Sequence, residues 1–147
     1  MRNKVILITG AIDGIGRQTA VELAALVQRF SSTGAIWPGQ SCSRRDPDVT
    51  GNREVDFFIA DFASLKQVRE LAAEVQRQYD RLNVPVNNEG VFMNEGKSTG
   101  NGFEMTYAVN HLAPFLLTNL LLDLLKRSAP YRVITVSSVA HTRANRF

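Results

Sequence analysis

Apolar and polar positions along this chain follow two alternating periods. Val5–Thr9 is a short continuous apolar run, which is typical of a strand buried on both faces of a sheet. Val55–Ala60 is a second strand candidate, and helical spacing of apolar residues follows over 16–27 and 65–79. Strands that alternate with helices predict βαβ units, and hence a parallel sheet covered on both faces.

The pattern continues with two more strands and one long helix. The strands are expected at Leu82–Val86 and Arg132–Ser137, and a helix that is apolar almost all round in its second half is expected at 103–127. Residues 31–54 have the composition of a loop, with at most a damaged strand at 34–37. The sequence therefore predicts an α/β fold with a doubly wound parallel sheet of about five strands.

A glycine-rich turn joins the first strand to the first helix. Gly10, Gly14 and Gly16 have the spacing Gly-x-x-x-Gly-x-Gly, with Asp13 and Ile15 between them. Gly10 allows a sharp exit from the strand, Gly14 lets the backbone approach a pyrophosphate, and Gly16 lets helix and strand pack closely. These five residues are candidate cofactor-binding residues. The alternative is a strand-to-helix turn without a ligand.

The turn Thr9–Gly16 resembles the cofactor turn of the short-chain dehydrogenase/reductase family, and the resemblance extends along almost the whole chain. It implies a Rossmann-type, NAD(P)-binding domain over residues 1–147. It also implies that Asp61 accepts a hydrogen bond from the adenine amino group, while the N–H of Phe62 meets a ring nitrogen.

A second motif, Val86-Asn87-Asn88-Glu89-Gly90, resembles the family's Asn-Asn-Ala-Gly. In the family the first Asn ties the sheet together beside the cofactor, so the resemblance adds Asn87 and Gly90 to the cofactor-binding candidates. Glu89 replaces the alanine. An acid near a pyrophosphate is repulsive, and its larger side chain takes space.

Two further segments resemble the parts of the family that carry the chemistry. Tyr107–Leu112 is similar to the helix with the Asn of the catalytic tetrad, which implies that Asn110 distorts the helix locally and holds a water in a proton relay. Val133–His141 is similar to the strand that ends in the catalytic Ser, which implies that Ser138 polarises a substrate carbonyl. The run to Phe147 is most similar to the retinol-dehydrogenase-like branch. The implied reaction is hydride transfer between a nicotinamide and a carbonyl or alcohol carbon.

The family's reaction also uses a Tyr-x-x-x-Lys pair, in which the Lys stabilises the phenolate. None of Tyr79, Tyr107 and Tyr131 has Lys four positions later. We therefore expect a domain incomplete at its C-terminus, cut off after about the fifth strand, with that strand at an uncovered sheet edge. The chain alone is expected to be inactive. The alternative is a truncated fragment or pseudoenzyme that at most binds a nucleotide, or forms a homodimer through the 103–127 helix.

Prolines depart from the expected pattern at three places. Pro85 lies within a central strand, where it removes a donor from the sheet. Pro114 lies within the long helix, which it should bend. Pro38-Gly39 falls where the second strand is expected.

The choice between NADP and NAD depends on the end of the second strand. Residues 36–41 contain no acid of the kind that binds ribose hydroxyls, and Arg44 and Arg45 follow. A guanidinium suits a phosphate, which favours NADP. The alternative, a solvated pair of arginines beside two aspartates, stays open.

Charge and composition exclude several other classes of protein. The chain has 17 Lys and Arg against 14 Asp and Glu, and residues 126–147 supply the basic excess. Without a basic stripe on a recognisable module, nucleic-acid binding is not expected. Phe115–Leu125 is too short to span a membrane, and the lone Cys42, without a partner in the chain, excludes a disulfide scaffold. We expect a cytoplasmic protein without a metal site, and the resemblance implies a nicotinamide dinucleotide and a small carbonyl or alcohol substrate as its ligands.

Overall fold

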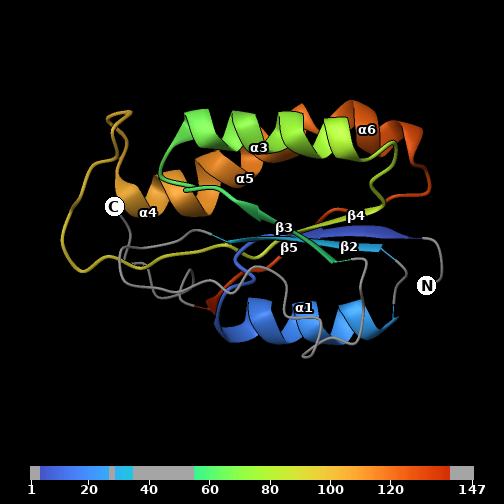
Figure 1. The fold of residues 1–147 in the computed structure, drawn as a ribbon. Coiled ribbons are helices and arrows are strands. Elements are labelled where there is room, and N and C mark those ends of the chain that lie inside the picture. Colours follow the sequence, from blue (N-terminus) through green and yellow to red (C-terminus); the bar gives the residue numbers. More distant parts are fainter. Residues whose placement is uncertain (1–3, 27–28, 35–54, 140–147) are drawn as a thin grey trace.

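The computed structural model describes residues 4–26, 29–34 and 55–139 (Figure 1). Within the described residues, the first half of the chain forms three strands and two long helices, and the second half forms two strands and a row of short helical segments. In chain order these are β1 Val5–Ile8, α1 Gly14–Leu26, β2 Arg29–Gly34, β3 Val55–Ile59, α3 Leu65–Gln78, β4 Val84–Asn87, α4 Met105–Tyr107, a π-helical turn Ala108–Leu112, α5 Ala113–Leu120, α6 Leu122–Arg127 and β5 Ile134–Thr135.

The five strands form one parallel sheet in the order β3-β2-β1-β4-β5. Helix α1 covers one face, and α3, α5 and α6 cover the other (Figure 1). The predicted α/β, doubly wound architecture is therefore confirmed. Because the chain turns outward in opposite directions from β1 and β4, these neighbours form the switch point at which such sheets leave a crevice beyond the carboxyl ends of their strands.

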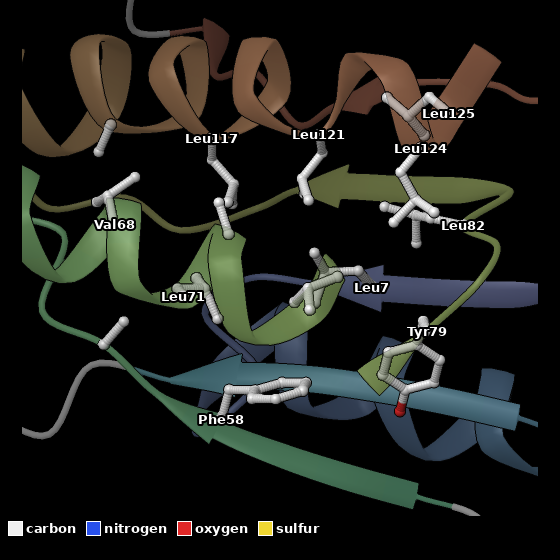
Figure 2. Packing of buried hydrophobic residues seen from close by; sticks show 14 of the residues in the cluster. Leu7, Phe58, Val68, Leu71, Tyr79, Leu82, Leu117, Leu121, Leu124 and Leu125 are labelled. Carbon is white, nitrogen blue, oxygen red and sulfur yellow. The ribbon is translucent and has the colours of Figure 1, made fainter. Parts of the chain in front are cut away.

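The apolar run of the first strand is explained by burial on both faces. Leu7 faces the larger core cluster with α3 and α5, whereas Ile6 and Ile8 face the smaller cluster beneath α1. Figure 2 shows the larger cluster, in which side chains of the helices and of the strands gather in the space between them. Its labelled members are Leu7, Phe58, Val68, Leu71, Tyr79, Leu82, Leu117, Leu121, Leu124 and Leu125.

The expected position of the second strand is wrong. The strand is Arg29–Gly34 and not 34–37, so Pro38-Gly39 follows the strand and lies outside the described residues. Its sequence, Arg-Phe-Ser-Ser-Thr-Gly, lacks an apolar run. It becomes a strand because it pairs with β1 on one side and β3 on the other, so its backbone hydrogen bonds are satisfied from both neighbours.

The expected single helix at 103–127 is also wrong. It is divided into α4, the π-helical turn, α5 and α6, with a break at Leu121 where φ is −88° and ψ is 0°. The N–H of Ala113 bonds to the carbonyl of Ala108, five residues back, and Pro114 then stands in the first turn of α5. Burial is one-sided, because Leu117 is buried while Phe115 is 62% exposed.

The last strand is shorter than expected, but its predicted exposure is confirmed. Only Ile134–Thr135 pairs with β4, and the side chains of Val133, Ile134 and Val136 are all exposed. Pro85 is tolerated in β4 for a related reason. The carbonyl of Val86 faces β1, and that of Asn87 faces β5, where it accepts from Val136 N. By the alternation along a strand, the missing donor of Pro85 faces the edge strand and not β1, and the bonds on either side of it, from Arg132 N to Asn83 O and from Val136 N to Asn87 O, are kept.

Candidate cofactor site

The glycine turn after β1 combines close packing with an open backbone. Gly10 and Gly14 have φ of 67° and 56°, values that glycine adopts without strain. A Cβ on Gly16 would lie 2.1 Å from the carbonyl oxygen of Gly10, so that position must stay bare. A Cβ on Gly14 would meet no atom within 4 Å in the described part of the chain. The backbone at Gly14 is therefore accessible to a ligand, as a pyrophosphate site requires.

Asp13 and Ile15 both flank this opening. The Oδ1 atom of Asp13 accepts a hydrogen bond of 2.6 Å from the N–H of Gly14 and so caps the first turn of α1. The Ile15 side chain is 73% exposed at the same helix end. A phosphate bound here would compete with Asp13 for the N–H of Gly14, because both are anionic acceptors.

The segment after β4 is fastened to the glycine turn by a residue that the sequence analysis did not select. The side-chain amide of Asn88 donates to the carbonyls of Thr9 at 2.9 Å and Gly10 at 3.2 Å. The hydroxyl of Thr9 accepts from the N–H groups of Asn88 and Glu89, each at 2.9 Å. Thr9 and Asn88 thus join the ends of β1 and β4. In the sequence, a hydroxyl residue directly after the first strand and an amide residue directly after the fourth could have indicated this link.

The predicted tie through Asn87 takes a different form. Its backbone carbonyl accepts from Val136 N at 2.9 Å and so links β4 to the residue after β5. Its side-chain amide instead donates to the hydroxyl of Thr118 on α5, at 3.1 Å. Asn87 therefore joins the sheet to a covering helix. Whether it contacts a cofactor stays a prediction.

Asn110 lies in the π-helical turn, which agrees with the local helix distortion expected there. Its side chain accepts from Val91 N at 2.8 Å and donates to Val91 O at 2.9 Å, which holds the loop after β4 against the helix. A Cβ on Gly90 would lie 3.5 Å from Asn110 Oδ1. The structure therefore brings Gly90 and Asn110 together, and the proton-relay role of Asn110 stays a prediction.

Asp61 and Phe62 follow β3 at the same edge of the sheet. The exposed Asp61 accepts a hydrogen bond of 2.8 Å from Ala63 N through Oδ1, and its own N–H donates to Gln67 Oε1 at 2.9 Å. The Phe62 side chain is buried in the core, with 1% exposed. The core thus anchors Phe62 while Asp61 points outward, an arrangement compatible with the expected adenine contact.

Glu89 is the acid that the sequence predicts to repel a pyrophosphate. Its Oε2 lies 3.1 Å from the point where a Cβ on Gly10 would stand, against the glycine turn. That oxygen is buried, and no hydrogen-bond partner for it exists among the residues that the structure describes. Burial, and secondarily the negative charge of Asp61, raise the pKa of Glu89 from 4.5 to about 7. The turn therefore fits a dinucleotide in shape, whereas the ionised Glu89 opposes one in charge.

The remaining predicted site residues are placed only in part. Ser138 is exposed and follows β5, so it leaves the sheet at the same carboxyl edge as the glycine turn. Arg44 and Arg45 lie outside the described residues. Within the described ranges no helix is long and apolar enough to cross a membrane, and no group of three or more His, Cys, Asp or Glu could hold a metal ion.

A parallel sheet of order β3-β2-β1-β4-β5 with a glycine turn at its switch point defines a Rossmann-type nucleotide-binding domain. The sequence model of one family within this class, described as short chain dehydrogenase, matches residues 4–146. The chain belongs to the short chain dehydrogenase family.

Within this family, the chain is similar to curated retinol dehydrogenases. The chain is 44% identical over 141 residues to retinol dehydrogenase 13 of Homo sapiens, covering 94% of this chain and 42% of that protein. It is 41% identical over 139 residues to retinol dehydrogenase 11 of Homo sapiens, covering 94% and 44%. The chain is therefore retinol-dehydrogenase-like and spans less than half the length of these relatives.

Solved structures agree with the fold. The Pseudomonas aeruginosa RhlG/NADP active-site complex superposes with a TM-score of 0.76 at 27% identity, over 95% of this chain and 56% of that one. An NADH-dependent reductase, A1-R′, complexed with NAD superposes with a TM-score of 0.73 at 23% identity, over 98% and 63%. The second likeness concerns the fold alone.

Proposed function

We propose that this chain is the cofactor-binding part of an NAD(P)-dependent oxidoreductase that acts on a small carbonyl or alcohol. The observation that carries the proposal is the glycine turn at the switch point, open at Gly14 and fastened to β4 through Asn88. Membership of the short chain dehydrogenase family supports it, as does the NADP named with the RhlG structure. The preference between NADP and NAD stays open.

The chain's own residues would divide the binding work along the carboxyl edge of the sheet. The backbone at Gly14 and Ile15 would receive the pyrophosphate, and Asp61 the adenine amino group. When bound, the nicotinamide supplies or accepts a hydride. Ser138 would polarise the substrate oxygen, and Asn110 would support the proton relay.

Turnover by the chain alone is not expected. No tyrosine of the 147 residues has a lysine four positions later, so the chain offers no Tyr-x-x-x-Lys pair for proton transfer to the substrate oxygen. The expected result for the purified chain is dinucleotide binding without oxidation or reduction of an alcohol or aldehyde. Turnover that persists after careful purification would contradict this part of the proposal.

Two matched glycine variants test the cofactor site. Gly14 and Gly102 both have positive φ, 56° and 80°, and a Cβ at either would meet no described atom within 4 Å. Gly14→Ala and Gly102→Ala should therefore lose similar stability, about 1 kcal/mol each. Only Gly14→Ala should weaken NADH and NADPH binding, measured by fluorescence titration. Equal affinities in the two variants would overturn the assignment of the turn.

A second candidate function, a homodimerising module, has one observation in its favour. Tyr107, His111 and Phe115 stack along the outer face of the α4–α5 segment, with centroid separations of 5.3 and 6.4 Å. All three are exposed, whereas Leu117 of α5 and Leu121, which follows α5, are buried in the core. A dimer through this region would therefore use the aromatic face, and Phe115→Lys should shift sedimentation toward monomer without loss of helical signal. A monomeric wild-type chain would exclude it.

A further inference from the structure

The backbone of Glu89 is fixed beside the glycine turn. Its N–H donates to the Thr9 hydroxyl at 2.9 Å, and its Cα lies 2.9 Å from the point where a Cβ on Gly10 would stand. The carboxylate lies against the glycine turn as well, with Oε2 3.1 Å from the same point. An anionic ligand that uses this turn must approach Glu89.

The charged groups on the neighbouring segments do not neutralise Glu89. They are Asp13 in the turn, Arg17 in the first turn of α1, and Asp61 after β3; His111 of the π-helical turn stacks instead with the aromatic face. Of these charges, that of Asp61 acts on Glu89, and it disfavours ionisation, as burial does. Both causes act in one direction and raise the Glu89 pKa to about 7.

The two protonation states of Glu89 would treat a pyrophosphate in opposite ways. The carboxylate only accepts hydrogen bonds and repels an anion, whereas the carboxylic acid carries an O–H donor that a phosphate oxygen can accept. The buried Oε2, which has no hydrogen-bond partner in the described ranges, is the atom that would gain one.

We propose that Glu89 controls the affinity of the glycine turn for the dinucleotide, which binds tightly when Glu89 is protonated and weakly when it is ionised. This inference rests on the proposed function, because it requires that the turn binds a dinucleotide. Protonation of Glu89 then becomes coupled to binding, and a bound pyrophosphate raises the pKa of Glu89 further.

The experiment measures NADH and NADPH dissociation constants for the whole chain at pH 6 and pH 8.5. If only the protonated form binds, a pKa of about 7 makes wild-type binding about 30-fold weaker at the higher pH. Glu89→Ala removes the charge and the bulk, and Glu89→Gln removes the charge but keeps the size and a donor. Both variants should bind equally at the two pH values, with the wild-type affinity at pH 6 or better.

Glu95→Gln is the matched control, because it removes an exposed acid from the same loop and should leave the wild-type pH dependence unchanged. Comparison of each variant with the wild type at one pH cancels any titration of the ligand itself. A change of pH dependence in Glu95→Gln equal to that in Glu89→Gln would overturn the proposal, since the effect would then be general charge repulsion.

The remaining outcomes separate this inference from the proposed function. If wild type and both Glu89 variants bind alike at both pH values, the turn is a dinucleotide site but Glu89 does not control it. If Glu89→Ala gains affinity and Glu89→Gln does not, the size of the side chain is responsible, and the charge mechanism is wrong. If no variant binds either dinucleotide at either pH, the proposed function fails, and this inference fails with it.

Discussion

Glu89 should also make the folded chain less stable as the pH rises. Its folded-state pKa of about 7 lies above the ordinary value of 4.5, because burial and then Asp61 disfavour its ionised form. An acid with a raised pKa does not lower the stability of the fold while it is protonated in both the folded and the unfolded chain. Its destabilising effect grows as the pH rises from the pKa of the unfolded chain to that of the folded one. The window is therefore about pH 4.5 to 7, with stability lost toward the alkaline side.

The size of this loss of stability follows from the shift in the pKa of Glu89. A shift from 4.5 to about 7 corresponds to about 3 kcal/mol of destabilisation above the window, and to about 1 kcal/mol at pH 5.5. Glu89→Gln removes the titration while keeping the shape of the side chain. Relative to the wild type, the variant should therefore gain about 2 kcal/mol more at pH 8.5 than at pH 5.5.

The assay is urea unfolding followed by far-ultraviolet circular dichroism at those two pH values. A buried amide has its own cost, but that cost does not depend on pH, so the change in the difference between the proteins is the measured quantity. Glu95→Gln, in the same loop but exposed, should show no such change. A constant difference between wild type and Glu89→Gln at both pH values would refute the reasoning.

Three further predictions concern the glycine turn and the open edge of the sheet. Asn88→Ala should lower the free energy of unfolding by about 2 kcal/mol, because the carbonyls of Thr9 and Gly10 lose their donor. Asn94→Ala, at an exposed loop position, should change it by less than about 0.5 kcal/mol in the same urea titration. Gly16→Ala should cost about 3 kcal/mol or more, since its Cβ would stand 2.1 Å from a backbone oxygen, whereas Gly96→Ala, where a Cβ meets no atom of the described residues within 4 Å, should be nearly neutral by thermal unfolding. Val136→Lys should reduce self-association in light scattering without loss of stability, because this side chain is 46% exposed beside the edge strand; unchanged association would show that the exposed apolar row is not responsible.

The elements that the sequence predicted well are those whose signal is local. Val5–Ile8 is buried on both faces, so its run of apolar residues is enough to identify a strand. Helix α3 begins after Ser64, whose hydroxyl accepts from Gln67 N at 3.4 Å, and its apolar residues repeat with helical spacing. The glycine turn was predicted because its three glycines are required by the local backbone geometry of one segment of eight residues.

Elements that depend on distant neighbours were predicted poorly. The polar segment Arg29–Gly34 is a strand because β1 and β3 pair with it, which no local pattern expresses. Within 103–127 the sequence predicted a distortion at Asn110 and a bend at Pro114, but not the bonds from Asn110 to Val91 in a different loop. The resemblance of Tyr107–Leu112 to a family helix pointed to Asn110 but not to these partners.

The sequence by itself determined the class of the fold, the glycine turn and the presence of an acid beside it, because spacing, burial on both faces and residue type are properties of short segments. The tertiary structure alone decided that Asn88 holds the ends of β1 and β4 together, and that the Glu89 carboxylate is buried against Gly10 within reach of the charge of Asp61. Those facts depend on three strand ends meeting at one edge of a parallel sheet. The burial of the Glu89 carboxylate and its repulsion by Asp61, which together raise the pKa of Glu89, arise only because these strand ends lie close together.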